Sequence, residues 1–253
     1  SSLYGGTYNL LSVTLPRHGI TTTFVDPSDA ENFKSAVQEN TRTFFIESLG
    51  NPKLDVLDIE AISNQAKAFK VPLIVDNTVA TPCLLNPIEY GANIVIHSLT
   101  KYINGNGTAL GGAIIDAGTF DWANGKFPEF TEPSPGYHGL VYSEVLEAAA
   151  FIAKIRIEGL RDYGAALSPF NAFQIIQGLE TLEVRIQKHS ENALLLAQWL
   201  QKQDLVAWVN YPGLENSAFK SLAARYLPNG QSGLVTFGVN GGYDAAKKIV
   251  DTT

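Results

Sequence analysis

The stretch VPLIVDNTVATPCLLNPIEYGANIVIHSLTK, residues 71–101, decides the fold class. It holds two short apolar runs, at 71–75 and 94–96, and each run ends in a cluster of polar residues. Continuous apolar runs of this length are typical of parallel strands that are covered on both faces. The stretch therefore predicts strands over 71–76 and 94–98, with a short helix or turn over 86–91 between them.

The same alternation continues on both sides of this stretch. Residues 43–48 and 112–115 have the composition of two further strands. From Ile59 to Phe69, apolar residues recur at offsets of 3, 4 and 3, which places them on one side of a helix over 58–70. Strands that alternate with helices predict an α/β fold with a mostly parallel sheet.

The second half of the chain has longer helical patterns. Residues 118–139 form an irregular segment rich in Pro and Gly, which is either a functional or partner-contact element or a solvated loop. Helical patterns follow over 143–158, 169–187 and 190–202, and strand-like runs follow over 206–210 and 234–239. We expect a large domain over 1–150, and a helical linker with the start of a smaller α+β domain over 151–253.

Composition limits the class of protein. The 253 residues include 18 Lys and Arg against 25 Asp and Glu, so the formal net charge is −7. An acidic balance disfavours a general nucleic-acid binder, which needs a positive surface. No apolar run approaches the ~20 residues that cross a bilayer, so we expect no membrane partner.

The cysteine and histidine content bears on disulfides and metals. The single cysteine, Cys83, excludes internal disulfides and fits a reducing compartment, so we expect a cytoplasmic protein. The four histidines are scattered without ligand spacing, so we predict no metal site. The chain has no methionine, begins at Ser1-Ser2-Leu3-Tyr4 and stops at Thr253 inside a predicted helix. We expect it to be a piece of a longer polypeptide.

Polar clusters follow three predicted strands, at 47–52, 76–78 and 97–101. Ligands of open α/β sheets bind outside the carboxyl ends of the strands, so these clusters form one crevice if the strands are neighbours. Pyridoxal phosphate needs a lysine for a Schiff base, an anion beside its pyridine nitrogen, and hydroxyls or amides for its phosphate. We predict that Lys101 forms the Schiff base and that Asp76 keeps the pyridine nitrogen protonated. Ser98 and Thr100 would hold the phosphate.

Each of these residues also has a purely structural interpretation. A lysine after a strand is commonly a solvated loop residue, and an aspartate there is commonly a turn or helix cap. Ser98 and Thr100 could likewise be caps. Neither the dinucleotide fingerprint nor the P-loop is present, which disfavours a nucleotide-binding protein.

Four segments, in the correct order, resemble the Cys/Met-metabolism family of pyridoxal-phosphate enzymes. They are Tyr4-Gly5-Gly6-Thr7-Tyr8, Glu47-Ser48-x-x-Asn51-Pro52, Asp76-Asn77-Thr78-x-x-Thr81-Pro82 and His97-Ser98-x-Thr100-Lys101-Tyr102. The resemblance implies the aminotransferase-like fold type I and a tyrosine, Tyr4, that stacks on the cofactor ring and shuttles a proton. It also implies that Asn51 contacts the 3′-oxygen of the cofactor and that Thr78 belongs to the cofactor site.

Within this family the chain is most similar to the O-acetylhomoserine sulfhydrylase branch. Gly105-Asn106-Gly107-Thr108 resembles a segment of that branch, except that Asn106 replaces a histidine. The resemblance implies that sulfide or a thiol replaces the acetate of O-acetylhomoserine, giving homocysteine when sulfide is used. It also implies a homotetramer built from dimers.

Two alternatives to this activity stay open. One is a related member of the family: a cystathionine γ-synthase, a methionine or cystathionine γ-lyase, or an O-succinylhomoserine sulfhydrylase. The other is an inactive truncated chain that acts only as a binding or assembly module. The resemblance implies that the family's Gly-rich phosphate loop lies before the Tyr4 segment. It also implies that the arginine for the substrate carboxylate lies after residue 253.

Overall fold

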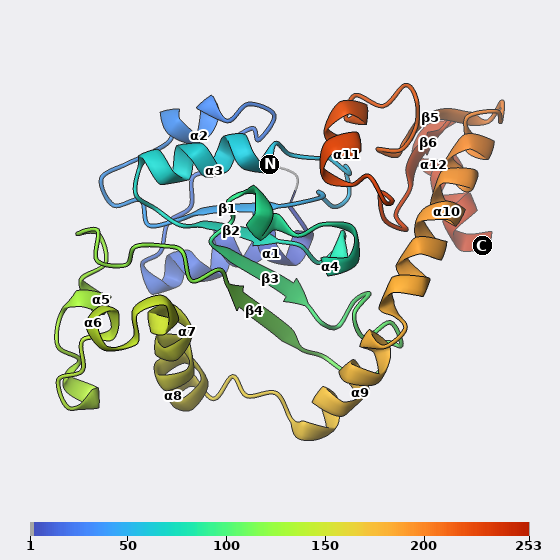
Figure 1. The fold of residues 1–253 in the computed structure, drawn as a ribbon. Coiled ribbons are helices and arrows are strands. Elements are labelled where there is room, and N and C mark those ends of the chain that lie inside the picture. Colours follow the sequence, from blue (N-terminus) through green and yellow to red (C-terminus); the bar gives the residue numbers. More distant parts are fainter. Residues whose placement is uncertain (1–2, 253) are drawn as a thin grey trace.

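The computed structural model describes residues 3–252. Ser1, Ser2 and Thr253, where the sequence begins and stops, lie outside the described residues. A four-stranded sheet in the order β1-β2-β3-β4 lies at its centre (Figure 1). The strands are β1 Phe44–Glu47, β2 Leu73–Asp76, β3 Ile94–Ser98 and β4 Gly112–Asp116. The first three are parallel, which confirms the α/β fold with a mostly parallel sheet.

The fourth strand differs from the expectation that neighbouring strands run parallel. β4 is antiparallel to β3, with Ser98 opposite Gly112 and Ile94 opposite Asp116. The connection from β3 to β4 consists of turns and contains no helix. A parallel return needs a crossover connection, usually a helix, so this connection brings the chain back antiparallel.

Helices cover both faces of the sheet, with α2 and α3 on one face and α1 and α7 on the other (Figure 1). The helices before the linker are α1 Gly5–Asn9, α2 Glu31–Ser35, α3 Ile59–Ala68, α4 Thr81–Leu84, α5 Pro128–Thr131, α6 Tyr142–Leu146, α7 Ala150–Lys154 and α8 Arg161–Tyr163. Those that follow are α9 Pro169–Leu179, α10 Leu182–Leu200, α11 Lys220–Tyr226 and α12 Gly242–Thr252. Short 3-10 or π turns occupy Leu10–Thr14, Leu15–His18, Pro87–Tyr90, Pro135–Tyr137, Glu147–Ala149 and Ile155–Leu160.

The helical patterns predicted over 169–187 and 190–202 are divided differently in the structure. α9 ends at Leu179, and a single helix, α10, then runs from Leu182 to Leu200. The break lies at Thr181, whose hydroxyl donates to the carbonyl of Gly178 (3.3 Å) and accepts from Arg185 Nε (3.0 Å). These side-chain bonds replace helical ones at the junction, and apolar periodicity does not reveal them.

Successive side chains along the strands point to opposite faces of the sheet, and they pack into two separate hydrophobic cores. Phe44, Val75 and Val95 face a large core with α3. Ile74 and Ile94 face a second core built around Trp122, Tyr142 and Ala150. Both faces of the sheet are therefore covered, as the continuous apolar runs predict.

A second, two-stranded sheet lies beside α10, α11 and α12 (Figure 1). It pairs β5 Val206–Asn210 antiparallel with β6 Thr236–Val239. These elements have the α+β composition that is expected after the helical linker. The domain limits of 1–150 and 151–253 stay a prediction.

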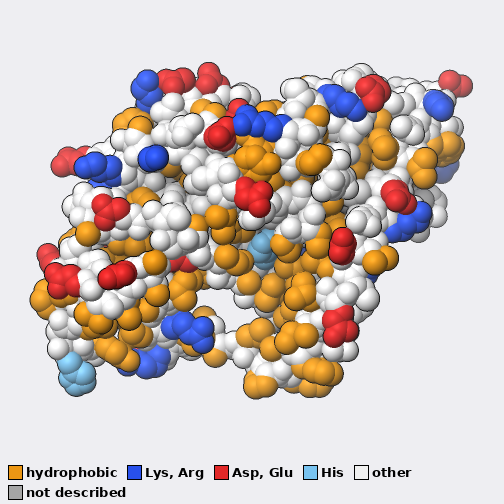
Figure 2. Space-filling view, viewed as in Figure 1, with side chains coloured by type: hydrophobic (Ala, Val, Ile, Leu, Met, Phe, Trp, Pro, Cys, Tyr) orange, Lys and Arg blue, Asp and Glu red, His pale blue; other side chains and the backbone are white. Residues whose placement is uncertain are grey.

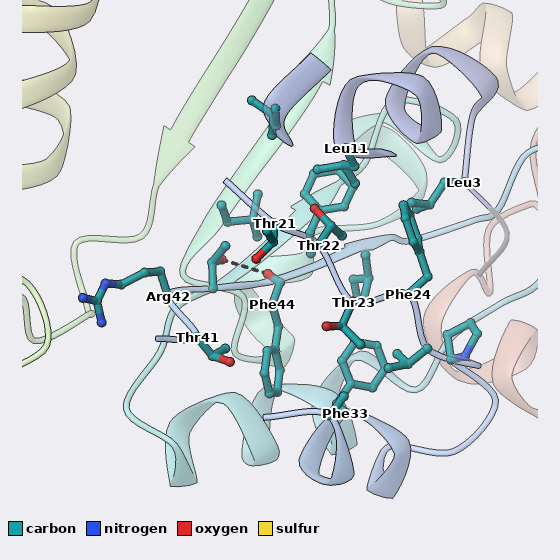
Figure 3. A pocket seen from close by; sticks show the side chains of 18 of the residues that line it. Leu3, Leu11, Thr21, Thr22, Thr23, Phe24, Phe33, Thr41, Arg42 and Phe44 are labelled. Atoms are coloured by element: carbon teal, nitrogen blue, oxygen red, sulfur yellow. Dashed lines mark hydrogen bonds between the residues drawn. The ribbon is translucent and has the colours of Figure 1, made fainter. Parts of the chain in front are cut away.

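The outer edge of β1 borders a cavity of about 670 Å³. Residues 20–25, which belong to no helix or strand, form a wall of this cavity. Figure 3 shows Thr21, Thr23 and Phe24 from this wall near Phe44 of β1. The cavity reaches Glu47 and Gly50 of the predicted 47–52 cluster, but its lining does not include Asp76, Ser98 or Lys101.

One side of α9 is apolar and open to solvent. Phe170, Phe173 and Ile176 are spaced by three residues, and each exposes more than half of its surface (68%, 58% and 55%). Figure 2 shows hydrophobic side chains gathered in the region of α9. Contiguous exposed apolar surface is typical of a protein–protein contact. This agrees with the expected oligomer, whose composition stays a prediction.

Candidate active site

The carboxyl ends of β1, β2 and β3 lie side by side. The register places Glu47 beside Asp76 and Asp76 beside Ile96. The three polar clusters predicted from the sequence therefore meet at one edge of the sheet, as the crevice rule for open α/β sheets requires.

The two faces of the sheet divide these polar residues into two groups. Glu47 and Asp76 share one face, while Ser48 and Asn77 follow them on the other. The Ser48 hydroxyl donates to Asn77 Oδ1 (2.8 Å), and Asn77 Nδ2 donates to the carbonyls of Thr81 (3.1 Å) and Leu85 (2.8 Å). Because these bonds are internal, Ser48 and Asn77 shape the loop after β2 and are not free to bind a ligand.

Tyr4 and Lys101 meet on the face that carries Glu47. The Tyr4 amide donates to Glu47 Oε1 (2.7 Å), and Lys101 Nζ lies 5.5 Å from the centroid of the Tyr4 ring. Among residues 3–252, Lys101 Nζ makes no hydrogen bond or ion pair. The structure thus brings together the two residues predicted to be catalytic and leaves the lysine amine available.

Asp76, Thr78 and Ser98 are joined through backbone amides. Asp76 Oδ1 accepts from the Thr78 amide (2.9 Å), and Thr78 Oγ1 accepts from the Ser98 amide (2.8 Å). These bonds fix the loop after β2 against the end of β3. The Ser98 hydroxyl has no hydrogen-bond partner in the described part of the chain, so it is available for an anion.

Thr100 and Asn51, the two remaining predicted site residues, lie in loops that follow strands. The Thr100 hydroxyl accepts from the Gly111 amide (3.2 Å) and donates to the Gly111 carbonyl (3.4 Å). These two bonds hold Thr100, just after β3, against Gly111, just before β4, and so stabilise the connection between the two strands. Asn51 begins the turn after β1, and its amide acts to lower the pKa of the Glu47 carboxyl. Contacts of Thr100 and Asn51 with a cofactor stay predictions.

Burial shifts the pKa values of two side chains near Asp76, those of Glu47 and His97. Desolvation raises the pKa of Glu47 to about 7, and the Asp76 charge adds to the rise, while the amides of Tyr4 and Asn51 oppose it. Desolvation also lowers the pKa of His97, against the opposite effect of the Asp76 charge. His97 is buried, its Nδ1 has no partner within the described residues, and strand alternation places it on the face opposite Asp76.

The raised pKa of Glu47 predicts a pH effect on stability. A carboxyl group whose pKa rises on folding stabilises the fold fully below its unfolded pKa, here 4.5, and loses that contribution as the pH rises through about 7. Glu47→Gln cannot ionise, so it should flatten the fall in melting temperature between pH 4.5 and 7. Thermal unfolding across this range measures it, with the exposed Glu39→Gln as control. An unchanged slope in Glu47→Gln would contradict the prediction.

A feature that the sequence reasoning missed holds the loop after Lys101. Arg185 of α10 donates to the carbonyls of Tyr102 (2.8 Å), Ile103 (3.4 Å) and Gly178 (2.7 Å). Gly178 of α9 packs directly on the backbone of Asn104. The loop is therefore clamped between α9 and α10. No local motif signals this clamp, because its members are far apart in the sequence.

These residues fit pyridoxal phosphate. A free amine faces an aromatic ring at Lys101 and Tyr4, and a carboxylate ends the central strand at Asp76. The unpartnered hydroxyl of Ser98 suits a phosphate oxygen. The donor set matches the amine, anion and hydroxyl that the cofactor needs.

Two other searches concern metals and membranes. Within residues 3–252, His, Cys, Asp and Glu side chains form no group of three that could hold a metal ion. No helix in that same range has the length and hydrophobicity that a membrane crossing requires.

Comparison with known proteins identifies the family. The family model described as Cys/Met metabolism PLP-dependent enzyme matches residues 1–253. The chain belongs to this family. This confirms the resemblance carried by the four sequence segments.

Curated relatives of this Cys/Met-metabolism chain are sulfhydrylases and synthases. It is 54% identical over 260 residues to an O-acetyl-L-homoserine sulfhydrylase of Leptospira meyeri. It is 48% identical over 254 residues to a homocysteine synthase of Schizosaccharomyces pombe. Both comparisons cover 99% of this chain, which spans 59% of the length of either relative.

A solved structure supports the fold of the Cys/Met-metabolism chain. It comes from Campylobacter jejuni, is named as an O-acetylhomoserine (thiol)-lyase and contains a pyridoxyl-lysine monophosphate. The two chains share 41% identity and a TM-score of 0.96, over 100% of this chain and 63% of the other. The fold type I architecture expected from the resemblance is confirmed.

Proposed function

We propose that the protein containing this chain replaces the acetate of O-acetyl-L-homoserine with sulfide or a thiol, using pyridoxal phosphate held at Lys101. With sulfide the products are L-homocysteine and acetate. The observation that carries the proposal is the free amine of Lys101, which lies 5.5 Å from the Tyr4 ring in the turn after β3, the strand that pairs with the strand of Asp76. The names of the relatives support this substrate over those of the related γ-synthases and γ-lyases.

Pyridoxal phosphate, when bound, supplies an electron sink for negative charge that develops on the amino-acid substrate. Asp76 would hold a proton on the ring nitrogen, because an opposite charge favours the protonated form. The Lys101 amine would hold the cofactor and, once released, carry protons to and from the substrate carbons. The Tyr4 ring would cover the site, and its hydroxyl would shuttle a proton.

Four residues would bind and orient the cofactor. The Ser98 hydroxyl is free to bind the phosphate, and Thr78 holds the Ser98 amide in place. Thr100 would assist at the phosphate, and Asn51 would contact the 3′-oxygen. Acetate would leave from the γ-carbon as its C–O bond breaks, and sulfide would form the new C–S bond there.

Product analysis of the full-length protein tests this activity. O-acetylhomoserine and sulfide should give homocysteine and acetate in equal amounts, as measured by mass spectrometry. O-succinylhomoserine or cystathionine in place of O-acetylhomoserine should react much more slowly. A preference for either of them would favour a related family member. No turnover with any donor would favour the binding or assembly module.

Small molecules are the partners that this proposal requires. We also propose that the protein assembles as a homotetramer and works in the cytoplasm. The exposed apolar side of α9 supports an assembly. The acidic net charge supports the absence of a nucleic-acid partner.

A further inference from the structure

We propose that Glu47 is a positioning residue that fixes the Tyr4 ring over Lys101 through the Tyr4 backbone. The inference rests on the proposed function, since it concerns the same cofactor site. None of the roles predicted for the site residues includes Glu47.

The hydrogen bonds of Glu47 support this role. Glu47 is the last residue of β1 and only 5% exposed. Its Oε1 accepts from the Tyr4 amide (2.7 Å), and the Asn51 amide helps to lower the pKa of the same carboxyl. One buried side chain at the end of β1 therefore holds the backbone of Tyr4, which is 43 residues away in the sequence.

The position of Tyr4 makes this bond important for the ring. Tyr4 immediately precedes α1, and no side chain caps the amino end of that helix. Tyr4 exposes 47% of its surface, so packing alone restrains its ring weakly. The bond to Glu47 anchors Tyr4 through its amide and leaves the phenol hydroxyl free for the reaction.

Burial and charge distinguish Glu47 from an ordinary loop carboxylate. A buried polar group that loses its partner is costly, so the Glu47 carboxylate and the Tyr4 amide hold each other in place. The Asp76 charge on the neighbouring strand acts on this carboxylate, and Lys101 Nζ lies 5.5 Å from the centroid of the Tyr4 ring. Glu47 thus connects the backbone of Tyr4 to the end of β1, which pairs with the end of β2 that carries Asp76.

A double-mutant cycle tests whether Glu47 acts through Tyr4. Full-length apoprotein is titrated with pyridoxal phosphate, and the Kd is measured by absorbance for wild type, Glu47→Leu, Tyr4→Ala and the double variant. Glu47→Leu should raise the Kd about tenfold in the wild-type background. With Tyr4→Ala, which keeps the amide but removes the ring, the same change should raise the Kd less than threefold. Equal effects in both backgrounds would overturn the inference.

Two further variants refine the test. Glu47→Gln keeps an acceptor oxygen for the Tyr4 amide, so its Kd should stay within about threefold of wild type. Glu47→Asp shortens the side chain by one methylene and should weaken binding of pyridoxal phosphate. If Glu47→Leu does not fold, Glu47→Asp takes its place in the cycle. Equal loss in Glu47→Gln and Glu47→Leu would contradict positioning by a hydrogen bond. Absence of binding by the wild type would instead contradict the proposed function.

Discussion

Lys101→Ala in the full-length protein should leave no pyridoxal phosphate attached to the polypeptide after borohydride reduction. Turnover of O-acetylhomoserine should fall by at least about 10²–10⁴-fold, the contribution of a positioned proton-transfer group alone. The physical reason is that Lys101 offers an amine without a competing partner, next to the Tyr4 ring and the end of β3. No other lysine is placed in this way in the described chain.

Peptide mapping after reduction measures the outcome. Lys53→Ala is a matched control, because Lys53 is exposed in the turn after β1 and its side chain makes no hydrogen bond or ion pair within residues 3–252. It should keep the label on Lys101 and most of the turnover. Undiminished label in Lys101→Ala would show that another amine holds the cofactor.

Gly178→Ala should reduce the free energy of unfolding by more than about 3 kcal/mol, near the upper end of overpacking effects. A Cβ at this position would lie 2.6 Å from the carbonyl carbon of Asn104 and 2.8 Å from its Cα. Both atoms are backbone, so neither can move aside as a flexible side chain would. The loop after Lys101 would have to shift, and the Arg185 bonds to Tyr102 and Ile103 would weaken with it.

Urea denaturation measures this effect, and a second glycine provides the control. Gly159 is also helical, and a Cβ there would meet only the Ile155 side chain, at 3.7 Å. Gly159→Ala should therefore be neutral or stabilise the chain by up to about 1 kcal/mol. Similar losses in the two variants would show that the close packing of α9 on Asn104 is unimportant.

Local patterns predict the central sheet well, since its strands are defined by short-range features. The apolar runs that end in Glu47, Asp76 and Ser98 specify β1, β2 and β3 and place their polar ends together. The direction of β4 depends on the connection before it, which carries no clear periodicity. The boundary between α9 and α10 depends on side-chain bonds of Thr181 and Arg185.

The site is predictable only in part. Asp76, Ser98 and Lys101 follow strands, so the topology of the sheet brings them together. Tyr4 precedes the strands, and its place beside Lys101 follows from the family resemblance and not from any spacing. Arg185 and Gly178 act through tertiary contacts, which a single sequence does not encode in a readable pattern.

The open side of β1 has a consequence for handling these residues alone. In the described structure β1 pairs with β2 only, so its outward amides and carbonyls face the cavity and form a template for an extended chain that displaces residues 20–25. Lysine and proline, which commonly discourage such addition, are absent from Phe44–Glu47. An isolated preparation of residues 1–253 should therefore aggregate through strand-to-strand growth as its concentration rises.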